Sequence, residues 1–222
     1  PWVFLESNTM GTLNMLEVCR QFGCKKFILA STSSIYGGNP IYPTPETASS
    51  SEPLQPYAAS KKGAEVLAHS YHHLYDIDVT VVRYFTVYGP AGRPDLAMFR
   101  FVQWINEGQP IRINGDGNQS RGFTYVDDIV SGTIKVIDAN LKCEIMNIGG
   151  DREETLTRYI EVLENCLGKK AKKKMLPMQP GDVPATVADI RKLRKLGWKP
   201  TTRIEVGIQK FVEWYKNYYR IS

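Results

Sequence analysis

Two short apolar segments constrain the fold of this chain more than any other feature of its sequence. Residues 26–32 read Lys-Phe-Ile-Leu-Ala-Ser-Thr and residues 79–84 read Val-Thr-Val-Val-Arg-Tyr, so both predict strands that are buried on two faces. Between them, Pro56 precedes apolar residues at helical spacing. A strand, a helix and a strand in this order indicate an α/β domain with a parallel sheet, in which ligands bind at the carboxyl ends of the strands.

The rest of the chain continues this alternation. Helical spacing of apolar residues predicts further helices over residues 3–23, 96–107, 126–139, 155–167, 189–196 and 204–215, and short strands are predicted over 111–113 and 144–148. The lysine-rich segment 169–174 is expected to form a solvated turn. The chain is therefore expected to fold throughout.

Charge and cysteine content limit the class of protein. The 28 basic and 23 acidic residues give a net charge of +5, which suits phosphorylated ligands but is too small to indicate nucleic acid as a partner. No apolar run approaches the roughly 18 residues of a membrane span, so no membrane insertion is expected. The four cysteines form no metal or disulfide pattern, which predicts reduced thiols and a cytoplasmic location.

A tyrosine and a lysine stand four residues apart at the start of the helix that follows Pro56. Tyr57 and Lys61 therefore share one face of that helix, and the ammonium lies near the phenol. A free tyrosine has a pKa of about 10, and a nearby cation favours its phenolate. The pair predicts a tyrosine that works as a base near neutral pH.

Several further motifs accompany this pair, and together they identify a family. The motifs are Asn8-x-x-Gly11-Thr12, the Ser/Thr run that ends in Tyr36-Gly37, Pro56-Tyr57-x-x-x-Lys61, Arg83-Tyr84-Phe85, Tyr88-Gly89-Pro90, Gly115-Asp116-Gly117, Arg121-x-Phe123-x-Tyr125-Val126-Asp127-Asp128 and Pro180-Gly181-Asp182. With these motifs the chain resembles the extended short-chain dehydrogenase/reductase family, and within it the nucleotide-sugar epimerases. The resemblance implies an NAD-dependent enzyme with a Rossmann-like parallel sheet and a smaller C-terminal substrate-binding region.

The resemblance also implies roles for residues at the strand ends. Tyr57 would remove the proton of a sugar hydroxyl, with Thr32 as the hydrogen-bond partner of the same oxygen. Lys61 would bind the nicotinamide ribose of NAD, and Asn8 and Tyr84 match the other positions beside that cofactor.

One motif of the fold does not occur in the 222 residues. No G-x-G-x-x-G sequence follows a predicted strand, so the N-terminal part of the Rossmann sheet is expected to be absent, and the chain is expected to begin inside a longer protein. On this interpretation residues 1–90 are the C-terminal part of an NAD-binding domain. Residues 91–222 mainly bind the nucleotide sugar, and some of their segments return to the sheet.

The residues after Thr32 separate the reactions of the family. Dehydratases carry Asp-Glu there, whereas this chain has Ser33 and Ser34, which have no comparable acid or base capacity. The chain is therefore expected to be an isomerase that oxidises C4 of a UDP-sugar to a transient 4-keto sugar and returns the hydride to the opposite face. Ser31 and Ser33 are the alternative positions for the role given to Thr32.

The predicted substrate residues point to an acidic sugar. Thr86 and Arg93 resemble the subgroup that interconverts UDP-glucuronate and UDP-galacturonate, in which these positions contact the sugar carboxylate as an arginine fork favours. Ser33 belongs to the same Ser/Thr-rich strand end. Arg121 matches the contact to the pyrophosphate and Asp182 the contact to the uridine ribose.

Other functions remain open at this stage. They are a UDP-hexose or UDP-N-acetylhexosamine 4-epimerase, a UDP-glucuronate decarboxylase, and a non-catalytic fragment that binds a nucleotide sugar. No metal is expected, since His69 and His73 have no third ligand at suitable spacing. A homodimer is expected, because the family pairs through the first helix and the helix of Tyr57.

Overall fold

A three-stranded parallel sheet forms the centre of the structure, a computed structural model that describes residues 1–38, 41–179 and 181–221. Its strands are β1 (Lys26–Thr32), β2 (Asp78–Tyr84) and β7 (Cys143–Ile148), in the order β1-β2-β7. Both predicted strands are confirmed. β2, which lies between the other two, is buried along its middle, whereas β1 is not buried on both faces as predicted, since Ala30 is exposed.

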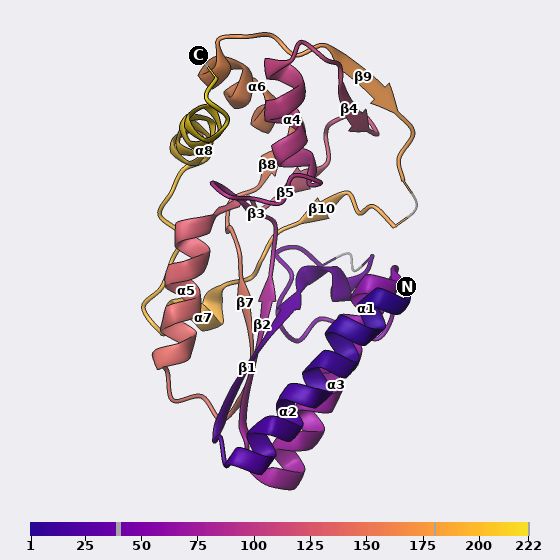
Figure 1. The fold of residues 1–222 in the computed structure, drawn as a ribbon, viewed down its shortest axis with the longest axis vertical. Coiled ribbons are helices and arrows are strands. Elements are labelled where there is room, and N and C mark those ends of the chain that lie inside the picture. The colour runs from indigo at the N-terminus through magenta and orange to yellow at the C-terminus, as the bar shows by residue number, and fades with distance from the viewer. Residues whose placement is uncertain (39–40, 180, 222) are drawn as a thin grey trace.

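Helices cover the two faces of this sheet (Figure 1). One face carries α2 (Gly11–Phe22) and α3 (Pro56–Tyr75), with a core formed by residues such as Leu16 and Ala64. The other carries α5 (Val126–Asp138) and α7 (Arg191–Lys195). The first predicted helix is continuous but not uniform: α1 (Trp2–Phe4) passes through a π-helical turn, η1 (Leu5–Met10), before α2 begins. Periodicity near 3.6 does not reveal such a turn.

A second core lies beyond the carboxyl ends of the strands. The helices α4 (Ala97–Asn106), α6 (Leu156–Leu167) and α8 (Ile204–Tyr219) pack there around aromatic side chains such as Phe99 and Tyr159. These three helices were predicted, since each has one apolar face.

Short strands lie outside the central sheet, and most of them were not predicted. They are β3 (Val87–Tyr88) paired with β6 (Thr124–Tyr125), β4 (Ile111–Asn114) paired with β9 (Lys173–Leu176), and the sheet β10 (Ala185–Thr186), β5 (Ser120–Arg121) and β8 (Glu154–Thr155). The prediction of a solvated turn over residues 169–174 was wrong at its end. Lys173 and Lys174 belong to β9, although both side chains are exposed as expected.

Segments from both halves of the chain contribute to the central sheet. Helix α5 and strand β7 follow residue 90 in the sequence but belong to the first core, and an isolated bridge joins Thr44 to Ala188. The indole N–H of Trp198 donates to the Asp128 carbonyl at 3.1 Å, which fixes the segment before α8 against α5. The two cores are therefore connected by several crossings of the chain.

The outer edge of β7 is closed by side chains rather than by another strand. Glu46 Oε1 accepts a hydrogen bond from the Asn147 backbone N–H at 3.1 Å. Lys192 Nζ donates to the Ile145 carbonyl at 2.9 Å. These contacts satisfy backbone groups that an edge strand otherwise leaves unpaired.

Two further properties bear on the expectations from composition. Within the described residues, no helix is both long and apolar enough to cross a bilayer. The four cysteines are all free thiols.

Candidate active site

A buried ionic network lies beneath the carboxyl ends of β1 and β2. Arg83, at the end of β2, is 1% exposed, and its Nε and Nη2 donate to the Glu65 carboxylate at 3.0 and 2.7 Å. Its Nη1 donates to the Tyr36 hydroxyl at 3.0 Å, and the guanidinium lies 4.9 Å from the Tyr36 ring centroid. A buried charge requires such partners, so β2, α3 and the turn after β1 are held in one arrangement.

This network distinguishes the hydroxyls at the end of β1. Ser31 Oγ donates to Glu65 Oε1 at 2.6 Å inside the network. Thr32 lies outside it, at the N-terminus of the 3-10 helix η2 (Ser33–Tyr36), where its Oγ1 accepts from the Ser34 N–H at 3.2 Å. Ser31 is therefore committed to a structural contact, whereas Thr32, which is also buried, lies outside the network and contacts Ser34.

Gly37 ends the turn that follows Thr32 and must be a glycine. Its φ is +58°, in the left-handed region, and a Cβ there would lie 2.5 Å from the Glu52 carbonyl oxygen. The loop that contains Glu52 therefore passes directly over the end of η2.

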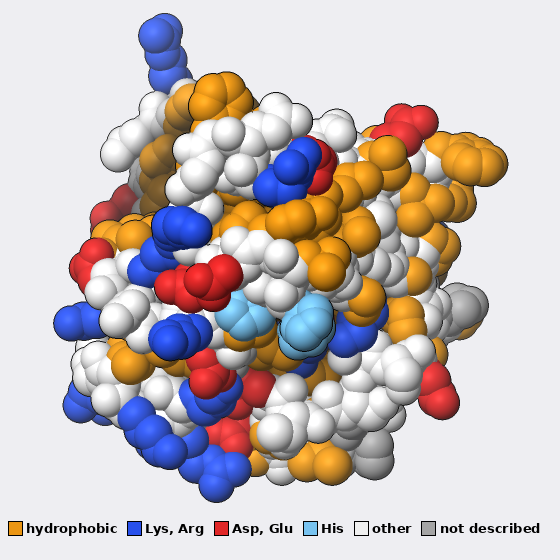
Figure 2. All heavy atoms as spheres, turned by 90° about the horizontal axis from the view of Figure 1, so that it is seen from below, with side chains coloured by type: hydrophobic (Ala, Val, Ile, Leu, Met, Phe, Trp, Pro, Cys, Tyr) orange, Lys and Arg blue, Asp and Glu red, His pale blue; other side chains and the backbone are white. Residues whose placement is uncertain are grey.

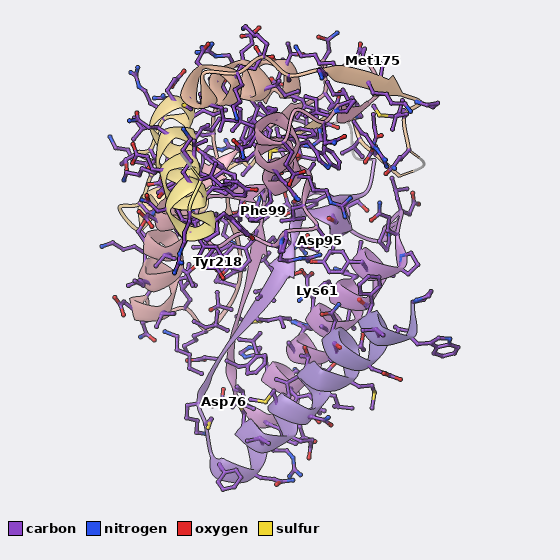
Figure 3. All side chains as sticks on the ribbon, turned by 45° about the horizontal axis from the view of Figure 1, so that its top comes forward. Lys61, Asp76, Asp95, Phe99, Met175 and Tyr218 are labelled. Atoms are coloured by element: carbon purple, nitrogen blue, oxygen red, sulfur yellow. The ribbon has the colours of Figure 1, made fainter. Side chains whose placement is uncertain are left out.

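Helix α3 carries three functional side chains along one face. Tyr57, Lys61 and Glu65 are spaced by four residues, and Pro56 occupies the first turn, where its missing N–H has no cost. Lys61 Nζ donates to the Ala30 carbonyl at 3.0 Å, and burial lowers the pKa of this ammonium. Figure 3 shows Lys61 beside the strand ends. No other acceptor for Lys61 occurs among the described residues, so two of its N–H groups remain available.

The first turn of α3 is braced by the N-terminal helix. Asn8 Nδ2, within η1, donates to Ser60 Oγ at 3.0 Å, and Ser60 Oγ donates to the Tyr57 carbonyl at 2.7 Å. The Tyr57 ring makes an edge contact with Phe4, with centroids 5.5 Å apart. Asn8 thus positions the backbone of Tyr57.

Tyr84 ends β2 on the side of the sheet covered by α5. Its hydroxyl lies 3.0 Å from Thr133 Oγ1 of that helix, and the side chain is half-buried. The position of Tyr84 beside a cofactor stays a prediction.

A polar cleft of about 180 Å³ opens between the two cores at the strand ends. Four residues predicted separately as substrate contacts line it: Ser33, Thr86, Arg121 and Asp182. The remaining lining residues are Ser34, Gly37, Leu54, Gln55, Gly181, Val183 and Thr186. Pro180, which begins the Pro-Gly-Asp motif, lies outside the described residues.

The cleft has the electrostatics of an anion site. Arg121 is half-buried, and burial lowers the pKa of its guanidinium while the nearby Asp182 charge acts in the opposite direction. Its Nη1 donates to the Ser120 carbonyl at 2.7 Å. Gln55, the residue before α3, also lines the cleft, so the positive end of a 20-residue helix lies at the same opening.

Arg93 does not line this cleft. Its guanidinium forms a two-point contact with the Asp95 carboxylate, with Nε 3.0 Å from Oδ1. The Arg93 and Asp95 side chains are 73% and 55% exposed. The Asp95 carboxylate therefore occupies the fork that was predicted to hold a substrate carboxylate.

Three residues of the site, Gln55, Thr186 and Glu65, were not predicted from the sequence. Glu65 could have been found, because it follows Lys61 by one further helical repeat of four residues. Thr186 lies four residues after Asp182, but no periodic pattern marks it.

The histidine pair rejected as a metal site and the Gly115-Asp116-Gly117 motif have contacts of their own. His69 Nδ1 lies 3.7 Å from Cys143 Sγ, and the Asp116 carboxylate accepts from the Asn118 N–H at 2.9 Å in a turn. No cluster of three or more potential ligands occurs within the described part of the chain.

The sheet, the Tyr57–Lys61 helix and the strand-end cleft define a Rossmann-like protein of the short-chain dehydrogenase/reductase type. The chain belongs to the NAD dependent epimerase/dehydratase family, whose model matches residues 1–149.

Individual relatives extend this assignment over nearly the whole chain. It is 53% identical to UDP-glucuronate 4-epimerase of Thermodesulfobacterium geofontis, over 97% of this chain and 67% of the relative. A Bacillus cereus UDP-glucuronic acid 4-epimerase solved with UDP-glucuronic acid and NAD has a TM-score of 0.92 and 37% identity, covering 97% of this chain and 69% of that one. A Thermotoga maritima UDP-glucose 4-epimerase solved with UDP-glucose has a TM-score of 0.91 and 31% identity, with 97% and 71% covered. The chain spans about two thirds of the length of these relatives.

Proposed function

We propose that the protein is an NAD-dependent 4-epimerase that interconverts UDP-glucuronate and UDP-galacturonate through a transient 4-keto sugar. The observation that carries this proposal is the cleft, because four positions far apart in the sequence meet there beside the Tyr57 helix. The Thermodesulfobacterium relative, named for this activity, supports the same choice of sugar.

Tyr57 is the proposed base. It takes the proton from the 4-hydroxyl of the sugar when the hydride leaves C4, and it gives the proton back when the hydride returns to C4. Thr32 holds the same oxygen by a hydrogen bond. Lys61 lies four residues further along the same face of α3, so its cation accompanies Tyr57 in the proposed site. The network around Glu65 keeps α3 and the end of β1 at a fixed separation during this transfer.

The nicotinamide end of NAD fits the residues at the strand ends. Lys61 is half-buried and has two unused N–H groups within the described structure, which suits the hydroxyls of a ribose. Asn8 supports the turn that carries Tyr57, and Tyr84 lies at the end of the neighbouring strand. When bound, NAD accepts the hydride of the sugar C4 and gives it back.

The nucleotide end of the substrate lies in the cleft. The Arg121 guanidinium and the N-terminus of α3 bind the diphosphate, and Asp182 accepts a hydrogen bond from the uridine ribose. On this proposal residues 1–90 mainly serve the cofactor and residues 91–222 mainly serve the nucleotide sugar.

The carboxylate of the sugar is assigned to hydroxyl donors of the cleft. Ser33 and Thr86 line the cleft and can donate hydrogen bonds to it, whereas Arg93 is held outside by Asp95. That pair favours a second candidate, a UDP-hexose 4-epimerase, whose substrate offers no carboxylate.

Product analysis tests the proposal. The product of the complete reading frame is incubated with NAD and UDP-glucuronate, and the expected product is UDP-galacturonate with no loss of carbon. Release of carbon dioxide with a UDP-pentose indicates a decarboxylase. Turnover of UDP-glucose alone indicates the hexose epimerase, and binding of UDP without any turnover indicates a non-catalytic protein.

We further propose a cytoplasmic homodimer that pairs through the N-terminal helix and α3. Apolar side chains on the outer faces of these helices support the pairing: Met10, Met15, Val18, Phe22, Val66 and Leu74 are all more than 40% exposed. The three histidines all come from α3, and Figure 2 shows exposed hydrophobic side chains beside them, together with charged ones. The four free thiols suit the cytoplasm.

A further inference from the structure

Thr186 presents a buried hydroxyl that has no hydrogen-bond partner within the described structure. Its Oγ1 is shielded from solvent, yet the side chain belongs to the lining of the strand-end cleft. A buried hydroxyl without a partner costs free energy, and in native proteins it calls for an explanation. The cleft supplies one, because a ligand there brings acceptor atoms to this side chain.

The pairing of β10 with β5 fixes where Thr186 lies. Thr186 is the direct partner of Arg121 in the parallel register, and the Gly122 N–H donates to the Thr186 carbonyl at 2.7 Å. Side chains of directly paired residues lie on the same face of a sheet, on strands about 4.8 Å apart. The Thr186 hydroxyl is therefore next to the guanidinium expected to hold the diphosphate.

The backbone of Thr186 is held by its pairing with β5, while its hydroxyl has a choice of positions. Rotation about the Cα–Cβ bond moves Oγ1 among staggered positions. Because the side chain lines the cleft, such a rotation can turn the shielded hydroxyl toward a ligand there.

We infer that the Thr186 hydroxyl donates a hydrogen bond to the diphosphate of the bound nucleotide sugar, beside Arg121. This inference rests on the proposed function, since it takes a nucleoside diphosphate as the ligand of the cleft. Thr186 would then be a further binding residue, and it would contact the diphosphate rather than the sugar that reacts.

The test compares Thr186→Val with the unchanged protein, using UDP as the probe in titration calorimetry. Valine keeps the shape and removes the donor, so the dissociation constant for UDP is expected to rise about tenfold or more, as for a hydrogen bond to a charged group. Thr186→Ser keeps the donor and is expected to bind within about threefold of the unchanged protein. The free energy of unfolding without ligand is expected to stay the same or to increase in Thr186→Val.

Thr80 provides a matched control. It is also a buried threonine whose hydroxyl has no partner within the described residues, but it lies in the middle of β2 and does not line the cleft. Thr80→Val is therefore expected to change unfolding in the same direction as Thr186→Val and to leave UDP binding unchanged.

The outcomes separate this inference from the proposed function. If the unchanged protein binds UDP and Thr186→Val binds it equally well, the role of Thr186 is wrong and the proposed function stands. A loss that appears with UDP-glucuronate but not with UDP places the hydroxyl on the sugar and also contradicts the inference. If the unchanged protein does not bind UDP, the proposed function itself is wrong.

Discussion

The hydroxyl groups of Ser31 and Thr32 at the end of β1 make different contacts, although the two residues are neighbours in sequence. Ser31 completes the buried network through Glu65, whereas Thr32 makes no contact with Glu65 and caps η2. The chemistry of a residue type is therefore decided by which contacts its neighbours already make.

Replacing Tyr57 by phenylalanine removes only the phenolic hydroxyl, which carries the transferable proton. Turnover of UDP-glucuronate is expected to be abolished, while the free energy of unfolding and the affinity for UDP stay nearly unchanged, because the ring contact with Phe4 is kept. Kinetics, denaturant unfolding and calorimetry of the same preparation measure the three quantities. Near-normal turnover excludes Tyr57 as the base.

Thr32→Val is expected to have a smaller effect on turnover than Tyr57→Phe. Loss of one positioned acid–base contact reduces kcat by a factor on the order of 10²–10⁴. Ser31→Ala is the control, since it should reduce stability by leaving Glu65 with one partner fewer and affect kcat less. A larger loss of kcat in Ser31→Ala would transfer the role to Ser31.

Arg93 is tested by the difference between two substrates. If it binds the sugar carboxylate, Arg93→Leu should reduce kcat/KM for UDP-glucuronate by about 10- to 150-fold and leave UDP-glucose unaffected. Asp95→Asn weakens the competing carboxylate, so it should raise kcat/KM for the acidic sugar only. Equal losses on both substrates mean that Arg93 only holds its loop, and then the neutral-sugar epimerase is favoured.

At the scale of elements, one face of α3 connects the proposed catalytic residues with stability. Tyr57 and Lys61 are the proposed site residues, and Glu65 one repeat further neutralises the buried Arg83. A displacement of α3 would therefore break the network and the site together.

The Glu65–Arg83 pair makes stability depend on pH. Burial raises the pKa of the Glu65 carboxyl, but the hydrogen bonds and charge of Arg83 and the bond from Ser31 lower it more, so its pKa lies below the ordinary 4.5. Its contribution is therefore fully present above the unfolded pKa and is lost as the pH falls through the lower, folded one. Glu65→Gln should cost about 3–5 kcal/mol at pH 7, because Arg83 is left unpaired.

Urea unfolding of both proteins across pH measures this effect. The difference in free energy of unfolding between Glu65→Gln and the unchanged protein should be constant from about pH 6 to 8 and shrink below pH 4.5. A difference that does not change with pH would show that the pair adds no charge-dependent stability.

The long elements could be predicted from the sequence, and the short ones could not. Strands β1 and β2 and helix α3 have apolar patterns longer than one turn or repeat, whereas the two-residue strand β10 has too few residues for any period. Lys173 enters β9 only because β4 lies beside it, which is a tertiary effect. In the site, helical spacing predicted the pairing of Tyr57 with Lys61, and the resemblance to the epimerases predicted the cleft residues. The contact of Asp95 with Arg93 was not foreseen.

At the scale of the whole molecule, the cleft is shared by two cores. Ser33 and Thr86 come from segments that belong to the sheet, while Arg121 and Thr186 come from short strands that lie outside it. A ligand in the cleft contacts both parts, so its binding should stabilise them together.

The proposed dimer is tested by mass and by surface charge. Light scattering of the product of the complete reading frame should report twice the mass of one chain, and Val18→Glu on α2 should reduce it to one. Val206→Glu on α8 is the control, since Val206 is 48% exposed and Val18 43%, but α8 lies outside the proposed interface. A monomeric unchanged protein, or equal effects of the two substitutions, contradicts this pairing.

The closed edge of β7 has a consequence for how the molecule behaves when crowded. A strand from another molecule could extend the sheet only by displacing the ammonium of Lys192 from the Ile145 carbonyl and the carboxylate of Glu46 from the Asn147 N–H. Such displacement leaves the two charged side chains without these hydrogen bonds and beside an incoming strand, which is unfavourable. The sheet therefore stops at β7, and this edge does not serve as a template for aggregation.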